Sequence, residues 1–155
     1  MIAVEVVRAR GHPLIRAAHR STFEVTREPS LTPRGDCIIG IAADKAPAQF
    51  SQRFKELASS EGALILIVLR AGGVTEVVRA RGDSRLRLSS LTSMVVRRSR
   101  YVDDRTVAVE SDKAAAHLDR RLVELLRRGA ELEVLLVAYT PGQEGEALRA
   151  AGLAP

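Results

Sequence analysis

The amino-acid sequence predicts a β-rich fold made of two β-β-β-α-β units, which close into one pseudo-twofold barrel or sandwich with two helices. Three observations lead to this prediction. The stretch EVVRARG occurs twice, at 5–11 and at 76–82. Each half then contains four segments rich in β-branched residues, which favour strands. Between the third and fourth of these segments, each half has apolar residues at helical spacing.

The similarity between the halves extends well beyond the seven identical letters. At an offset of 71 residues, Phe23 aligns with Met94 and Val25 with Val96. After a three-residue deletion the offset becomes 68, and CIIGIAADKA at 37–46 aligns with RTVAVESDKA at 105–114. The repeats cover 2–70 and 74–138. Because two such units usually bury their apolar faces against each other, we expect a single domain over 1–140.

The strands are expected in the same order in both repeats. In the first repeat they are predicted at 2–10, 19–26, 37–43 and 64–69. In the second they are predicted at 74–82, 91–98, 105–111 and 132–138. Partial period-2 alternation supports these assignments. The run Ala71-Gly72-Gly73 is typical of a tight hairpin, so the repeats are expected to join there.

The helices are expected over 45–60 and 113–128. Asp44 and Asp112 precede them and are the predicted N-caps. After Tyr139, the tail 141–155 begins with a Pro-Gly break. We expect this tail to form a short helix over 144–151 or to lack regular structure.

Composition narrows the functional classes. The net charge is +5 with a pI near 10.1, carried almost wholly by arginine, so an anionic partner such as nucleic acid is one alternative. The best candidate surface for binding nucleic-acid phosphates is one face of the second helix, with Arg120, Arg121, Arg127 and Arg128. Acidic residues are interleaved with these arginines, a pattern that a solvent-exposed helix surface also shows. No run of 18 apolar residues predicts a membrane span, and a lone cysteine without a visible signal peptide is typical of a cytoplasmic protein.

Each repeat serves as a control for the other. Polar residues shared by both copies, such as Asp44 and Asp112, are expected to support the common fold. Polar residues present in one copy only are better functional candidates, and they gather in the first half. In these one-sided positions His12 aligns with Asp83, His19 with Ser90, Glu24 with Val95, and Cys37 with Arg105. The three extra residues also lie in the first half, in the loop PSLTPRGD.

Glu24 is the leading candidate for chemistry. Alternation along the second strand places Arg20, Thr22, Glu24 and Thr26 on one face. If that face is buried, as Val95 suggests, the carboxylate is partly out of water unless Arg20 or Arg34 pairs with it, and it can act as a general base. The predicted catalytic residues are therefore Glu24, His19 and His12. The alternatives are a surface pair of Glu24 with Arg20 and two structural histidines.

The predicted ligand-binding residues extend along the second strand and the inserted loop. They are Thr22, Thr26, Thr32, Arg34, Gly35, Asp36 and Cys37. Spacings among the histidines, acids and cysteine match no metal-ligand motif, so we predict no metal site. No phosphate-binding loop or dinucleotide fingerprint identifies a cofactor.

Several of these residues form motifs seen elsewhere. Gly11-His12, the run His19-Arg-Ser-Thr22-Phe-Glu24-Val-Thr26, and Leu31-Thr-Pro-Arg-Gly35-Asp-Cys37-Ile followed by Ala43-Asp-Lys45 resemble the archaeal domain-of-unknown-function family numbered 371. The resemblance covers residues 2 to about 138 and implies an archaeal, single-domain, β-rich protein. Because that family has no established activity, the resemblance implies no catalytic role for any residue.

Three functions follow as hypotheses. The first is a site in the first repeat that binds or transforms a small anionic ligand, with Arg34 and Thr32 holding the anionic group. The second is a nucleic-acid-binding module that uses surface arginines. The third is a non-catalytic interaction protein, in which the one-sided polar residues only support the structure.

Overall fold

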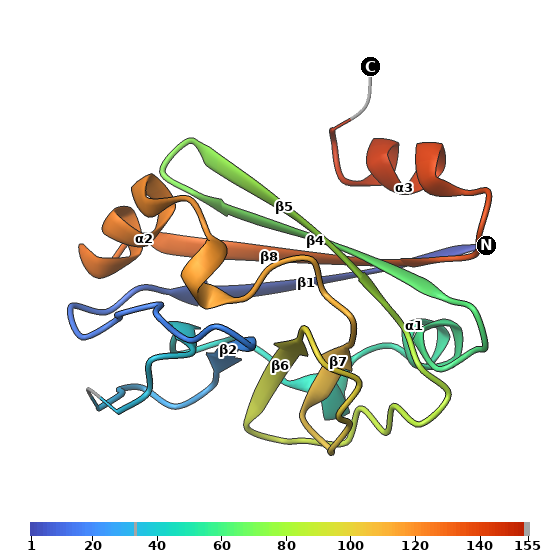
Figure 1. Cartoon of the computed structure of the whole chain (residues 1–155), viewed down its shortest axis with the longest axis horizontal. Coiled ribbons are helices and arrows are strands. Elements are labelled where there is room, and N and C mark those ends of the chain that lie inside the picture. The colour runs from blue at the N-terminus through green and yellow to red at the C-terminus, as the bar shows by residue number, and fades with distance from the viewer. Residues whose placement is uncertain (33, 154–155) are drawn as a thin grey trace.

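The computed structural model describes residues 1–32 and 34–153 (Figure 1). The first half contains β1 (Ile2–Arg10), β2 (Thr22–Thr26), β3 (Ile38–Gly40), a 3-10 turn η1 (Pro47–Gln49), α1 (Gln52–Ala58) and β4 (Leu64–Ala71). The second half contains β5 (Val74–Arg81), β6 (Ser93–Arg97), β7 (Thr106–Ala108), η2 (Ala115–His117), α2 (Arg120–Arg127) and β8 (Glu131–Tyr139). A last helix, α3 (Glu144–Ala150), follows.

The strands form two four-stranded sheets. Sheet A has the order β1-β8-β4-β5 and is antiparallel, whereas sheet B has the order β3-β2-β6-β7 with parallel pairs at both edges. Single bridges, Arg10 with Ile41 and Arg81 with Val109, connect the corners of the sheets. The described residues therefore form a two-sheet structure and not a closed barrel. Strands that align in sequence take mirrored places in each sheet, as a duplication predicts, although the duplication itself stays a prediction.

The junction between the halves is a two-residue hairpin. Ala71 pairs with Val74, and Gly72 and Gly73 have φ angles of 53° and 83°. Two successive positive φ angles define the tight turn whose twist matches antiparallel strands, and glycine adopts them without steric cost. The hairpin predicted at this position is confirmed.

Apolar side chains fill two separate clusters. The main core lies between the inner faces of the two sheets and includes Phe23 and Ile39 from sheet B. Helix α1 contacts β1 and β8, and α2 contacts β4 and β5, so the two helices lie toward opposite ends of the molecule (Figure 1). Helix α3 covers the outer face of sheet A and encloses a smaller apolar cluster there. No helix among the described residues is long and apolar enough to cross a membrane.

The predicted starts of the helices are wrong. Helix α1 begins after Ser51, whose hydroxyl accepts a hydrogen bond from Phe54 N, and α2 begins after Asp119, whose carboxylate accepts one from Arg121 N. The residues before these caps form the turns η1 and η2. Asp44 instead accepts a hydrogen bond from Arg8 N of edge strand β1, and Asp112 one from Arg79 N of edge strand β5. These aspartates satisfy edge-strand donors that would otherwise be free to pair with another chain.

The glutamate of each EVVRARG stretch is buried and paired. Glu5 accepts hydrogen bonds from Lys45 Nζ and, at 2.5 Å, from Ser51 N. Glu76 accepts them from Lys113 Nζ at 2.6 Å and from Asp119 N at 2.7 Å. Each carboxylate therefore fastens the start of its helix to an edge strand of sheet A. Removal of one partner of such a buried pair typically costs about 3–5 kcal/mol.

The glycine of each EVVRARG stretch allows a close approach between the halves. A Cβ atom at Gly11 would lie 1.8 Å from Leu126 O of α2, and one at Gly82 would lie 2.1 Å from Ala58 O of α1. Each strand thus ends against the helix of the other half, at a distance that any side chain would prevent. The repeated stretch is explained by the fold and requires no chemistry.

The tail contributes a third helix where the fold prediction had two. Gly152, with φ 71°, follows α3, and Leu153 N donates to Leu148 O at 2.9 Å. This is the hydrogen-bond pattern by which a glycine closes a helix C-terminus. Of the two outcomes expected for the tail, the structure therefore has the short helix.

Candidate functional site

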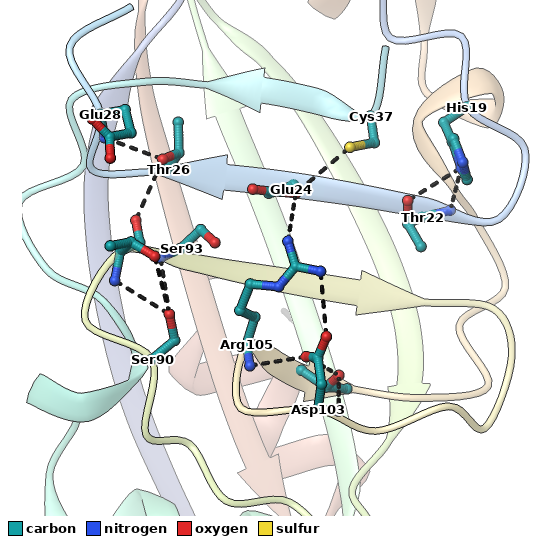
Figure 2. Close-up of polar contacts among 12 residues, drawn as sticks. His19, Thr22, Glu24, Thr26, Glu28, Cys37, Ser90, Ser93, Asp103 and Arg105 are labelled. Carbon is teal, nitrogen blue, oxygen red and sulfur yellow. Dashed lines mark hydrogen bonds and ion pairs between the residues drawn. The ribbon is translucent and has the colours of Figure 1, made fainter. Parts of the chain in front are cut away.

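Glu24 lies near the centre of sheet B, on the face that points away from the main core (Figure 2). Its neighbours Phe23 and Val25 point inward and are buried, and its cross-strand partner in β6 is Val95. The Glu24 side chain is only 14% exposed. The carboxylate is therefore mostly out of water, as the alignment with Val95 predicts.

Two residues that align with each other in the repeats both reach Glu24. Cys37 Sγ lies 3.6 Å from Glu24 Oε1 and donates to it, and Arg105 Nη1 lies 3.6 Å from the same oxygen. Arg105 thus supplies the ion pair for which Arg20 and Arg34 were the candidates in the sequence. In the sequence, Arg105 stands out only as the counterpart of Cys37. Its pairing with Glu24 joins the two halves of the chain and therefore leaves no local sequence pattern.

Arg105 extends the cluster to Asp103. Its Nη2 lies 3.3 Å from Asp103 Oδ2, and Arg97 Nη2 contacts the same oxygen at 2.9 Å. Burial alone would raise the pKa of Asp103, but the hydrogen bond from Arg105 N and the charges of Arg97 and Arg105 outweigh it, and the pKa falls to about 2. Both carboxylates are thus held by guanidinium groups (Figure 2).

Cys37 is a protonated thiol at neutral pH. Burial, and after it the charge and hydrogen bond of Glu24, raise its pKa from 9.0 to about 11. Because the thiolate is the nucleophilic form, a cysteine in this environment is a poor nucleophile. Its role in the cluster is that of a hydrogen-bond donor to Glu24.

The two histidines of the first half accept hydrogen bonds from backbone N–H groups, as the aligned residues of the second half also do. His19 Nδ1 accepts hydrogen bonds from Ser21 N and Thr22 N, each at 3.1 Å. In the other half, Ser90 Oγ accepts from the backbone of the two equivalent positions, at 3.2 and 3.3 Å. Because His19 closes this turn, β2 begins at Thr22, three residues later than predicted.

His12 follows the same rule. Its Nδ1 accepts a hydrogen bond from Leu14 N at 3.0 Å, and Asp83 Oδ1 accepts one from Arg85 N at 2.8 Å. His12 and Asp83 thus close equivalent turns in the two halves, and so do His19 and Ser90. A histidine that occurs in only one of the two repeats therefore does not by itself indicate a catalytic role.

The predicted ligand-binding residues are only partly brought together. Thr22 Oγ1 contacts His19 Nδ1 at 3.1 Å, while Thr26 is buried and accepts a hydrogen bond from Glu28 N at 3.1 Å (Figure 2). In the inserted loop, Gly35 N donates to Thr32 O, and Asp36 O accepts from Ala18 N and His19 N. The side chains of Thr32 and Arg34 are exposed. The catalytic and ligand-binding roles given to these residues stay predictions.

The charges around Glu24 do not favour an anion. Glu24 and Asp36 act electrostatically on Cys37, while Glu24, Asp103 and Asp104 act on Arg105. Three carboxylates, Glu24, Asp103 and Asp104, thus act on the Arg105 guanidinium group, and Asp36 adds a further negative charge near Cys37. Neither of the two cavities described below includes Glu24. Among the described residues, no group of three or more His, Cys, Asp or Glu side chains could hold a metal ion.

A groove of about 680 Å³ lies instead at one end of sheet A, where β1, β8 and the β4–β5 hairpin meet. This volume is in the range of small-molecule sites. Its charged lining residues are three arginines of the first repeat and two glutamates of β8: Arg8, Arg10, Arg70, Glu131 and Glu133. Backbone of the hairpin turn and of the segment after α2 completes it, at Gly72, Gly73 and Gly129.

The arginines of this groove are incompletely neutralised. Arg8 and Arg70 flank Glu133 across three neighbouring strands, and each lies 3.5 Å from a different oxygen of its carboxylate. Within the described part of the chain, no carboxylate lies within ion-pair distance of Arg10. Two of the three guanidinium groups thus share the carboxylate of Glu133, and the third, that of Arg10, has no such partner there.

A smaller cavity of about 260 Å³ gives an internal comparison. It also contains three arginines, one of which, Arg81, aligns with Arg10. There Arg85 binds Asp83 at 2.9 Å, Arg81 lies 3.2 Å from Glu110, and Arg100 also binds Glu110. Every arginine of this smaller cavity is paired, so it has no guanidinium group left for a ligand.

Sequence reasoning missed the groove, although the comparison of the repeats contained the signal. Arg70 aligns with Ala138, Glu131 with Ala63, and Glu133 with Ile65. These are one-sided polar residues like Glu24. These residues are inconspicuous in the sequence because they lie in or beside strands whose other residues are almost all apolar.

Comparison with known proteins places most of the chain in one group. A family model described as "Domain of unknown function (DUF371)" matches residues 7–139. An uncharacterized protein of Methanocaldococcus jannaschii is 37% identical over 127 residues, which is 82% of this chain and 93% of that protein. Glu24 and the charged groove residues lie inside the matched range, and α3 lies outside it.

Proposed function

The chain belongs to the DUF371 family, a family of unknown function, and we propose that it binds a small anionic ligand in the groove lined by Arg8, Arg10 and Arg70. One observation carries the proposal. Three guanidinium groups converge on an open groove in which, among the described residues, Glu133 is the one carboxylate that pairs with them, through Arg8 and Arg70. Guanidinium groups bind carboxylate and phosphate oxygens through paired, charge-assisted hydrogen bonds.

The ligand fits between two walls of different chemistry. Arg10 offers donors that pair with no acceptor in the described part of the chain, while Glu131 and Glu133 offer acceptors on the neighbouring strand β8. A ligand with a phosphate or carboxylate at one end and hydroxyl or amino groups at the other would use both. Counted together, three arginines and two glutamates give the groove a net charge of about +1 at neutral pH.

The nucleic-acid alternative has less support. On α2, Arg120 donates to Leu118 O, Ala17 O and Ala115 O, and Arg121 binds Asp119 at 2.6 Å. Arg128 lies 3.4 Å from Glu124. Three of the four arginines expected to meet phosphates are thus engaged within the protein.

The proposal is tested by titrating ¹⁵N-labelled protein with pyrophosphate and following amide resonances. Saturable shifts are expected at Gly72, Gly73 and Gly129, which line the groove. The variant Arg10→Ala should weaken binding about tenfold, as the loss of one charge-assisted contact would. The matched variant Arg81→Ala, at the aligned position in the smaller cavity, should bind as the unmodified chain does.

Two outcomes would contradict the proposal. One is the absence of saturable shifts in the groove amides. The other is an equal loss of affinity in both variants, which would indicate general charge attraction. A duplex nucleic acid is titrated in parallel. If the duplex binds with a steep salt dependence and pyrophosphate does not bind, the result would favour the nucleic-acid alternative.

A further inference from the structure

Arg70 belongs both to the groove and to the docking of α3. Its Nη1 lies 3.5 Å from Glu133 Oε1 in the groove, and its Nη2 donates a hydrogen bond to Ala151 O. Ala151 is the C-cap residue of α3, and Gly152 follows it close to the same guanidinium group. One side chain therefore connects the proposed ligand site to the last helix.

Helix α3 lies outside the part of the chain that the family model matches. The match ends at residue 139, and α3 spans Glu144–Ala150. A segment beyond the family match is thus attached to Arg70, a residue inside it.

The attachment of α3 is modest. Two buried alanines, Ala147 and Ala151, pack with Leu66 and Val137 on the outer face of sheet A. At the other end of the helix, Glu144 lies 3.2 Å from Arg79, and both side chains are about half exposed. A helix of seven residues is not stable alone, so its position depends on these contacts and on Arg70.

The last carbonyls of a helix lack partners within the helix and carry partial negative charge. Arg70 satisfies one of them and places a positive charge beside that end. An anion in the groove would draw on the same guanidinium group and bring like charge toward these carbonyls. We propose that α3 docking and anion binding compete for Arg70, so that α3 restrains ligand binding in the groove.

Competition of this kind is reciprocal, because the two events share one coupling free energy. Release of α3 must strengthen anion binding, and anion binding must loosen α3 by the same factor. The inference rests on the proposed function, since it requires that the groove bind an anion.

The test uses the full chain and two neutral substitutions in α3. Ala147→Gln places a larger polar group in the buried contact and should undock the helix, whereas Ala150→Gln adds the same group at an exposed position. Pyrophosphate should bind about two- to fivefold more tightly to the Ala147→Gln variant, as expected for an interaction at a helix end. The Ala150→Gln variant should match the unmodified chain. The variant Ala151→Gln, at the other buried alanine of the α3 contact, provides a second way to release the helix and should behave as Ala147→Gln does.

The reciprocal measurement is amide hydrogen exchange in the unmodified chain. Saturating pyrophosphate should accelerate exchange at Ala147 and Ala151, whose amides are hydrogen-bonded in α3. Equal or weaker pyrophosphate binding in both α3-released proteins would overturn the competition while leaving the groove as an anion site. Failure of the unmodified chain to bind pyrophosphate would instead remove the proposed function itself.

Discussion

Cys37 offers a direct measurement of the environment around Glu24, because it is the only cysteine in the chain and every thiol signal comes from it. Burial and the neighbouring Glu24 raise its pKa from 9.0 to about 11. The perturbation is Glu24→Gln, which removes the charge and keeps the size of the side chain. Glu28→Gln serves as the control, because Glu28 is an exposed carboxylate just beyond the same strand.

A rise of two pKa units lowers the thiolate fraction at pH 8 about a hundredfold, and thiolate is the form that reacts with disulfide reagents. Because burial is the first cause of the shift and Glu24 the second, the Glu24→Gln variant should recover part of this factor, about three- to tenfold. The Glu28→Gln variant should show no change.

The assay is the rate of reaction of the folded protein with an aromatic disulfide reagent between pH 7 and 10. Steric protection lowers the rate at every pH, so the pH at which the rate is half its maximum gives the pKa separately. In the native chain the rate should keep rising through pH 10, whereas in the urea-unfolded chain it should reach half its maximum near pH ~9. A half-maximal rate near pH ~9 in the native chain, or an unchanged profile in Glu24→Gln, would refute the described contact between Cys37 and Glu24.

Two further predictions concern stability. Gly11→Ala should lower the free energy of unfolding by about 3 kcal/mol in urea denaturation, because its Cβ would meet Leu126 O at 1.8 Å. Gly73→Ala is the control: its Cβ would meet open space, but its φ of 83° should cost about 1 kcal/mol. Equal costs in the two variants would argue against the close approach at Gly11. Asp103 has a folded pKa of about 2, below its unfolded value near ~3.9, so it stabilises the fold above pH ~4 and this stability is lost as the pH falls toward 2. Urea denaturation between pH 5 and 2 should therefore show a shallower loss for Asp103→Asn than for the unmodified chain, and parallel curves would contradict the depressed pKa.

The sheet strands were predictable because their signal is local. β-Branched runs, the Gly72-Gly73 turn and the repeated order of segments placed all eight strands, to within a few residues at most ends. The helix starts were not predictable in the same way. Asp44 has the residue type of an N-cap, but the tertiary fold brings Arg8 N of an edge strand to it, while Ser51 caps α1 instead.

The candidate site, like the helices, was only partly predictable from the sequence. Glu24 is largely out of water, as its alignment with Val95 favoured, and Cys37, another one-sided residue, contacts it. The comparison of the repeats also assigned chemistry to His12 and His19, which close the same turns as Asp83 and Ser90. Because a turn accepts any side chain with a suitably placed hydrogen-bond acceptor, letters that differ between the repeats can have the same structural role.

The sequence by itself determined the β-rich class, the two-part plan and the hairpin between the halves, since these depend on periodicity and on residues close together in the chain. Only the tertiary structure decided which distant residues meet. Arg105 reaches Glu24 from the other half, and Arg8, Arg10 and Arg70 converge because β1 and β4 both pair with β8. The tertiary structure also explains the repeated stretch EVVRARG. Glu5 needs a hydrogen-bond donor and Gly11 must lack a side chain, because each lies against a segment more than forty residues away in sequence.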